Sequence, residues 1–454
     1  MANLSKELAE FQKSIQAIAK GYDLDFFETV FEMVDYSQMN QIAAYGGFPI
    51  RYPHWRFGME YEGLSKGYEY GLSKIYELVI NNDPCYAYLL EGNSTTDQKL
   101  VMAHVFGHCD FFKNNKWFEN TDRKMMDTMG NHASRVRRHI DKYGIQTVEN
   151  FIDTCLSLEN LIDRYRPYVK NPNRKNTDGE AYAEKDILNF LIQHAEIEDW
   201  KKDIIQIIRA ESYYFSPQGM TKIMNEGWAS YWHAKMMTQD ICHDHEIVQF
   251  ADVHSGTMAM SPNGFNPYKI GIELYRNIEE RWNRGQFGRE WSDCKDIQKK
   301  ASWNLNLNQG REKIFQVRRD YNDVGFIDEF LTEEFCVENK LFVYKFNKKT
   351  NKFEIDTRDF KAIKSKLLFQ LANFGQPIIS AVDHNTNNKG ELLLSHLFEG
   401  VEMQPDYMKE TMARVFEIWQ KPVHISTVLD KEAKVVTYDG QEFQIKDFES
   451  ISNS

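Results

Sequence analysis

The sequence predicts an α+β fold in which a large, mainly helical N-terminal domain, residues 1–325, precedes a smaller C-terminal α+β domain, residues 326–454. Two observations lead to this prediction. Apolar residues recur at a period of about 3.6 through the first two thirds of the chain, as they do in amphipathic helices. Near Tyr321 this pattern gives way to short runs of β-forming residues separated by polar turns. A run of helices followed by a run of strands is typical of α+β architecture.

The helical part divides into ten predicted helices, each defined by its apolar periodicity. They cover residues 3–19, 26–40, 61–81, 96–114, 121–143, 148–164, 181–194, 200–214, 217–239 and 266–285. The polar stretch 170–185 is predicted to be a loop, because Pro172 and Gly179 interrupt it.

The C-terminal part alternates predicted hairpins with predicted helices. The stretches 340–356 and 377–397 each hold two runs of β-formers around a polar turn, and 422–445 holds two or three more strands. Between them, residues 360–375 and 407–420 have helical periodicity.

Composition limits the classes of function. The net charge of -12 argues against a nucleic-acid-binding protein, which needs a basic face. The first predicted helix, residues 3–19, is amphipathic and does not resemble a secretory signal, and no run approaches the roughly 18–20 apolar residues of a membrane span. The six cysteines include no C-x-x-C pair. We therefore expect a cytoplasmic protein with reduced thiols.

Two histidines share one face of the predicted helix 96–114. His104 and His108 are four residues apart, so that both imidazoles can point at one ion. Thr95 followed by Gln98 predicts a capping box at the start of this helix. A catalytic zinc usually takes three protein ligands, so a third must come from elsewhere in the chain.

The stretch "NEGWASYWH" offers the third ligand. Glu226, Ser230 and His233 form a polar stripe on a helix otherwise rich in aromatic residues, and a buried carboxylate is costly without a partner. We predict that Glu226 joins His104 and His108 at a metal. Two alternatives stay open: the histidines are core residues bonded to carbonyls, or Glu226 and His233 form a buried pair that ties helices together.

Several stretches together resemble one known family. "HVFGHCDFFKNNKWF", "NEGWASYWH", "YGGFPIRYPHWRFGMEYE" and the later "LANFGQPIISAVDHN" are similar to the stage V sporulation protein R (SpoVR-like) family, over nearly the whole chain. The resemblance implies a cytoplasmic protein associated in spore formers with assembly of the spore cortex peptidoglycan. In bacteria that form no spores it implies a stress response, with a serine kinase and a von Willebrand-type protein as partners. The resemblance does not indicate which biochemical activity the protein has.

A second, local resemblance concerns the metal. "EGWA" after a distant H-x-x-x-H is similar to the zinc site of gluzincin metallopeptidases, and so to a zincin-like fold; it implies zinc on His104, His108 and Glu226. The departure is Val105, which stands where that pattern has the glutamate that acts as general base. Another base would be required, and the nearest candidates along the sequence are Asp110 and His233.

Two functions follow from these residues. The first is a zinc-dependent amide hydrolase acting on a peptide or peptidoglycan-like substrate, with Asp110 or His233 moving the proton and Trp228, Tyr231 and Trp232 shaping the pocket. The second is a non-catalytic assembly or regulatory protein whose metal site is structural or vestigial. The second function needs no general base, so it is consistent with a valine at position 105.

Overall fold

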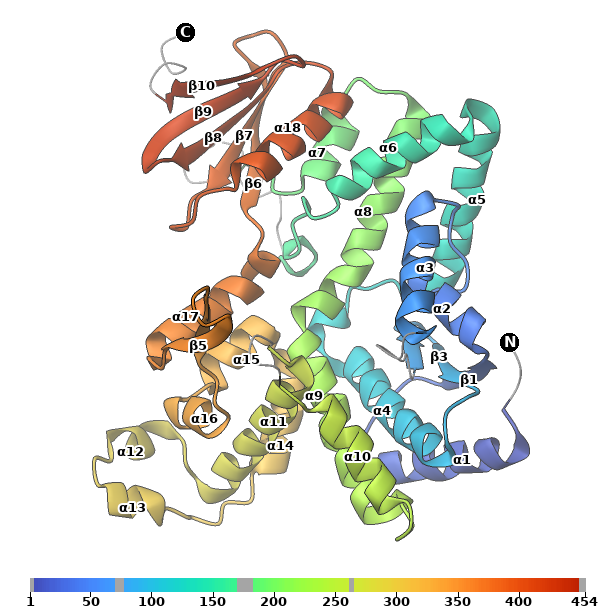
Figure 1. Cartoon of the computed structure of the whole chain (residues 1–454), viewed down its shortest axis with the longest axis vertical. Coiled ribbons are helices and arrows are strands. Elements are labelled where there is room, and N and C mark those ends of the chain that lie inside the picture. Colours follow the sequence, from blue (N-terminus) through green and yellow to red (C-terminus); the bar gives the residue numbers. More distant parts are fainter. Residues whose placement is uncertain (1–3, 70–76, 170–182, 261–264, 449–454) are drawn as a thin grey trace. The chain divides into compact units, whose positions relative to one another are not determined.

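The structure is a computed structural model, which describes residues 4–69, 77–169, 183–260 and 265–448 (Figure 1). The chain forms two compact units. The first consists of residues 1–50, 56–126 and 217–372, and the second of 51–55, 127–216 and 373–454. The predicted boundary after residue 325 lies inside the first unit, and a domain division at that point stays a prediction. Most of the predicted loop 170–185 lies outside the described residues.

The core of the first unit is built on five helices. These are α1 (Lys6–Gly21), α4 (Thr95–Asn114), α9 (Lys222–Met236), α11 (Pro267–Arg284) and α14 (Gly310–Asp320). Helix α9 packs against both α4 and α11, while α14 packs on α11 and α1 on α4. The aromatic side chains of α9 are buried in the core that these helices share, which makes α9 the central element of the unit.

A small sheet covers part of the helical core. It has the order β1-β3-β2, formed by β1 (Thr29–Val34), β2 (Glu77–Ile80) and β3 (Cys85–Leu90). Strand β1 runs parallel to β3, and β2 runs antiparallel to it. Nearly every residue of β3 is buried.

This sheet corrects two predicted helices. Residues 26–40 contain β1 followed by α2 (Tyr36–Ala44), and residues 61–81 contain the end of α3 (Trp55–Glu69) and then β2. The side chains of β1 alternate between buried and half-buried, which is the period of a strand. Pairing with a strand more than 50 residues away decided the conformation, and local periodicity carries no trace of such a partner.

The remaining described elements of the first unit surround this core. They are η1 (Lys116–Phe118), η3 (Met237–Ile241), α10 (Ile247–Thr257), α12 (Gly288–Asp293), α13 (Ile297–Ala301), α15 (Asp323–Phe330), α16 (Glu333–Glu338), the hairpin of β4 (Val343–Asn347) and β5 (Lys352–Thr357), and α17 (Phe360–Leu371). The hairpin and α17 confirm the predictions for residues 340–356 and 360–375.

The second unit combines helices with a five-stranded sheet of order β10-β9-β8-β7-β6. Its strands are β6 (Ile378–Thr386), β7 (Glu391–Leu397), β8 (Val423–Leu429), β9 (Glu432–Tyr438) and β10 (Phe443–Asp447). Its helices are α5 (Met125–Tyr143), α6 (Ile145–Ser157), η2 (Arg166–Tyr168), α7 (Ile187–His194), most of α8 (Asp199–Met220), η4 (Ala372–Gly375) and α18 (Pro405–Trp419). Helix α18 packs against α6, β8 and β9. The predicted C-terminal hairpins and the predicted helix 407–420 are therefore confirmed.

The content of helices and short sheets confirms the α+β class, with a large helical portion. Among the residues that the structure describes, every helix is either too short or too polar to cross a lipid bilayer.

Candidate metal centre

Helix α4 holds the two histidines on its buried side. It begins one residue before the predicted start, because Ser94 is the N-cap and Asp97, at the third helical position, completes the capping box. The predicted pair of Thr95 and Gln98 is therefore wrong by one residue. Ser94 has the extended backbone of an N-cap, and Gln98 instead donates a hydrogen bond to the carbonyl of Leu90.

Glycines allow α9 to approach this part of α4. Gly107 lies between the two histidines, and a Cβ placed there would be 2.7 Å from Cα of Ala229 on α9. On the other side of α9, a Cβ on Gly227 would lie 2.4 Å from the backbone of Gly271 on α11. The three helices can cross at this distance only because these positions lack side chains.

The close crossing brings Glu226 to the histidine pair. Its Oε2 lies 3.6 Å from Nε2 of His104 and 3.5 Å from Nε2 of His108. The candidate ligand atoms of the three residues all lie within 4.8 Å of one another. Tetrahedral ligands at about 2.0–2.1 Å from a zinc ion are roughly 3.4 Å apart, so the two distances from Glu226 match the spacing of ligands on one ion.

Glu226 also shows the electrostatic character of a ligand. Its Oε2 is buried and has no hydrogen-bond partner within the described structure. Burial by itself would raise the pKa of this carboxyl, but contacts with His104 and His108 outweigh it and hold the pKa below the usual range. A charged carboxylate oxygen without a hydrogen bond, facing two imidazoles, is the donor set that zinc prefers.

A second ring of residues orients both imidazoles. Nδ1 of His108 is 2.9 Å from Oδ1 of Asn225. An amide oxygen only accepts, so Nδ1 of His108 carries a proton, which leaves Nε2 as the nitrogen that would coordinate an ion. This is the outer-shell hydrogen bond that metal-bound histidines typically make.

His104 is held by a chain of histidines. Its Nδ1 lies 2.7 Å from Nδ1 of His233, and Nε2 of His233 lies 3.0 Å from Nδ1 of His254. If Nε2 of His104 presents its lone pair, its Nδ1–H donates to His233, which in turn donates from Nε2 to His254. Burial, and then the neighbouring His104 and His254, lower the pKa of His233 well below its usual value, which keeps this ring neutral.

The two predicted catalytic residues lie in different surroundings. His233 contacts the back of the His104 ring, and both of its nitrogens are engaged. Asp110 is fully buried, and two residues along a helix turn its side chain about 200° away from that of His108. Its carboxylate accepts hydrogen bonds from Trp228 Nε1 at 2.7 Å and from the backbone N–H of Asp25 at 2.8 Å.

These contacts make Asp110 a structural residue that ties α4 to α9 beside the site. Burial, opposed by the nearby Arg318, raises the pKa of Asp110 to about 6. The predicted pocket aromatics are also core residues: Trp228 and Trp232 are fully buried and pack on Phe315. Sequence reasoning missed Asn225, whose only signal was its place beside Glu226.

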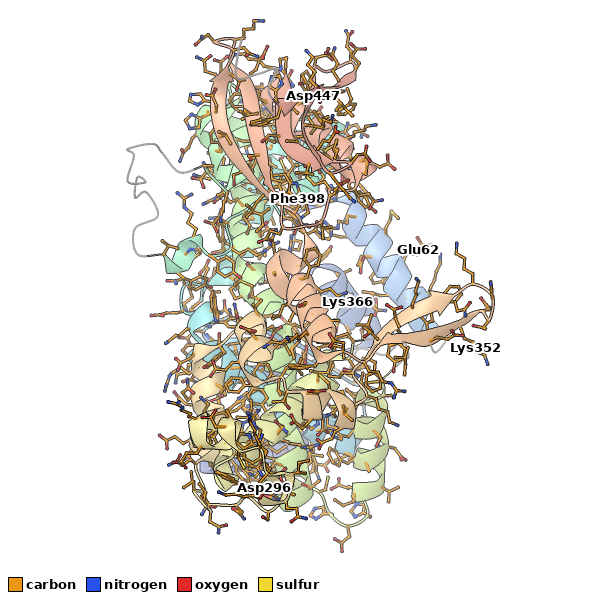
Figure 2. The ribbon with its side chains drawn as sticks, turned by 90° about the vertical axis from the view of Figure 1, so that its left-hand side faces the viewer. Glu62, Asp296, Lys352, Lys366, Phe398 and Asp447 are labelled. Carbon is orange, nitrogen blue, oxygen red and sulfur yellow. The ribbon has the colours of Figure 1, made fainter. Side chains whose placement is uncertain are left out.

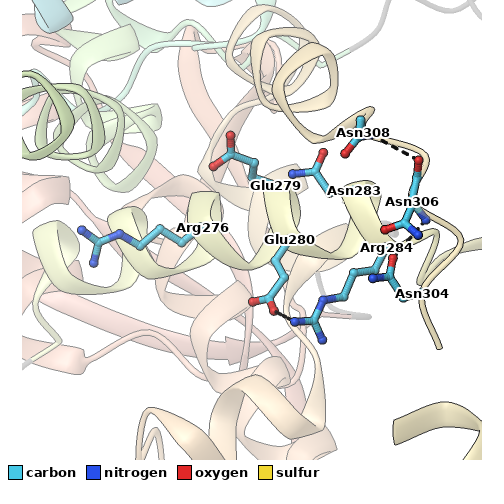
Figure 3. A pocket seen from close by; sticks show the side chains of 8 residues that line it. All are labelled: Arg276, Glu279, Glu280, Asn283, Arg284, Asn304, Asn306 and Asn308. Carbon is cyan, nitrogen blue, oxygen red and sulfur yellow. Dashed lines mark hydrogen bonds and ion pairs between the residues drawn. The ribbon is translucent and has the colours of Figure 1, made fainter. Parts of the chain in front are cut away.

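A separate polar hollow lies along the C-terminal half of α11 (Figure 3). It has a volume of about 330 Å³ and is lined by Arg276, Glu279, Glu280, Asn283, Arg284, Asn304, Asn306 and Asn308. Arg284 and Glu280 form an ion pair at 2.8 Å, and Glu279 accepts a hydrogen bond from Tyr231. Its charges are thus largely satisfied within the protein, and it shares no residue with the histidine site.

Comparison with known proteins identifies the family to which this chain is similar. The family model described as SpoVR like protein matches residues 3–185 and 169–376, which include both α4 and α9. The chain belongs to the SpoVR-like family. This SpoVR-like protein is 27% identical to "Uncharacterized protein YcgB" of Escherichia coli (strain K12), over 89% of this chain and 88% of the relative. No solved structure matches it.

Proposed function

We propose that this SpoVR-like protein binds zinc through His104, His108 and Glu226 and uses it to hydrolyse an amide bond. The convergence of three buried donors, two of them oriented by outer hydrogen bonds, supports this proposal. Three protein ligands leave a fourth position for water or substrate, as in catalytic rather than structural zinc sites. The Glu226 side chain is 17% exposed, although its Oε2 is buried.

The chain's own residues would set the chemistry. A bound zinc would polarise a carbonyl and lower the pKa of a water molecule. Asn225 holds the ring of His108, while His233, which is bonded in turn to His254, holds the ring of His104. Proton transfer through His233 would have to pass along the His104 ring, because His233 lies behind it. A peptide or a peptidoglycan-like precursor is the substrate class that we propose, with the protein in the cytoplasm.

A second candidate function is supported by Val105. This residue is fully buried and occupies the position of the usual general base. A non-catalytic assembly or regulatory protein with a structural zinc needs no base. In that case the partners implied by the family resemblance, a serine kinase and a von Willebrand-type protein, would carry the role in spore cortex assembly or in a stress response.

Metal analysis and hydrolysis assays separate these functions. We expect purified protein to hold about one zinc per chain, and His104→Ala and Glu226→Gln to lose it. His139→Ala is the matched control, because His139 pairs with Asp203 in the second unit. Zinc-dependent cleavage of a peptide or muropeptide library by wild type and by His139→Ala, and by neither site variant, would support the hydrolase. Bound zinc without any turnover would support an assembly protein with a structural site. Zinc-free wild type would refute the hydrolase and would leave an assembly protein with a vestigial site.

A further inference from the structure

The β4–β5 hairpin, residues 343–357, carries an apolar face that the described part of the chain covers only in part. Tyr344 pairs with Ile355, and Phe346 pairs with Phe353, so that these four side chains lie on one face. Phe346, Phe353 and Ile355 are 42%, 40% and 40% exposed. The two phenylalanine rings contact each other, with centroids 5.0 Å apart. We call this element the basic hairpin, because it carries four lysines.

Positive charge is concentrated at the end of the basic hairpin. The hairpin, residues 343–357, holds four lysines and two acidic residues, Glu354 and Asp356, in a chain whose net charge is -12. Lys345, Lys348, Lys349 and Lys352 are all exposed. In Figure 2 the hairpin projects from the helices of its unit, with Lys352 near its end. Lys348 and Lys349 lie in the turn at the end of the aromatic face, whereas Lys345 and Lys352 alternate with Phe346 and Phe353 and point to the opposite face.

The basic hairpin has little support from its own fold. Its two strands form a sheet by themselves, and isolated two-stranded hairpins are marginal in water. An exposed apolar face on such an element is costly unless it covers, or is covered by, something else. The combination of exposed aromatic residues and lysines is typical of segments that lie in the interface of an anionic membrane.

The type of basic residue, lysine or arginine, distinguishes a membrane surface from a protein partner. Protein interfaces are enriched in arginine and depleted in lysine, because the guanidinium makes directed, bidentate contacts. Residues 343–352 contain lysine alone, a strongly hydrated point charge suited to a diffuse negative surface. We propose that the basic hairpin docks on the surface of an anionic phospholipid bilayer, with Phe346 and Phe353 at the headgroup boundary and the lysines over the phosphates. This inference is independent of the proposed zinc chemistry.

Vesicle co-sedimentation of the full chain tests this proposal. We expect partition onto vesicles of phosphatidylcholine and phosphatidylglycerol in equal amounts, little onto phosphatidylcholine alone, and a decrease with added salt. Each lysine near an anionic surface contributes roughly fivefold, so Lys348→Glu/Lys352→Glu should weaken partition by about 25-fold or more. Phe346→Ser/Phe353→Ser should weaken it without a change in charge.

Two comparisons make the test decisive. Lys295→Glu/Lys299→Glu changes the net charge equally, at exposed lysines outside the hairpin, and should keep nearly full partition. Equal thermal midpoints would show that all variants are folded, and the comparison of the two vesicle types needs no variant. Equal binding to both vesicle types, an equal loss in the control variant, or equally strong binding to soluble polyglutamate would overturn the proposal; the last result would point to an acidic protein partner.

Discussion

Gly107→Ala should separate Glu226 from the histidine pair without touching a ligand. The added Cβ would lie 2.7 Å from Cα of Ala229 and 3.2 Å from its Cβ. Since carbon atoms pack at about 3.5–4.0 Å, α4 and α9 must move apart by about 1 Å. Glu226 lies one turn before Ala229 on α9, so it moves with that helix.

The shift exceeds what a zinc site tolerates. Metal–ligand distances hold to within about 0.2 Å of their ideal values, so a displacement of about 1 Å removes the carboxylate from the shared point. We expect zinc affinity to fall about 100-fold or more, the upper end of the effect of disturbed second-ring residues. Overpacking should also cost about 1–3 kcal/mol of unfolding free energy.

Competition with a chromophoric chelator measures the affinity, and urea denaturation measures the stability. Gly130→Ala is the matched control: it also places alanine at a helical glycine, on α5, where a Cβ would meet nothing within 4 Å. That variant should bind zinc like wild type and be stabilised slightly, because alanine favours helix. Wild-type zinc affinity in Gly107→Ala would refute the argument that this close crossing positions Glu226.

Three further predictions follow from the same geometry. Asn225→Ala should lower zinc affinity about 10–100-fold, because His108 loses the partner that orients its ring; a chelator competition with unchanged affinity would contradict this role. Chelation should lower the thermal midpoint of wild type, since ligand present at about 100 times its Kd adds about 2.7 kcal/mol, and His104→Ala should show no such response in differential scanning fluorimetry. Burial raises the pKa of Asp323 to about 8, although α9 backbone N–H groups that donate to it oppose the shift. The folded protein therefore holds this proton more tightly than the unfolded chain, so stability should fall as pH rises from about 4 to about 8. Asp323→Asn should flatten this part of the profile in urea denaturation, and an unchanged slope would show that Asp323 titrates normally.

Electrostatic reasoning from sequence recovered part of the candidate site. A polar stripe on an aromatic helix needs a partner when buried, and this argument selected Glu226 without any knowledge of the fold. The same argument could not assign Asp110, because its partners, the Trp228 indole and the Asp25 backbone, are distant along the chain. Similarly, His233 was recognised as part of the polar stripe, but its position behind His104 depends on how α9 is rotated against α4.

The sequence by itself determined the helices that carry His104, His108 and Glu226 and the C-terminal hairpins, because the period of apolar residues is a local property. Tertiary structure decided what that period cannot encode. Residues 29–34 became a strand because β3 pairs with them, and Glu226 reached the histidines because Gly107 and Gly227 let three helices cross at short range. Both outcomes depend on contacts between segments more than 40 residues apart, whose geometry is set by packing of the whole unit.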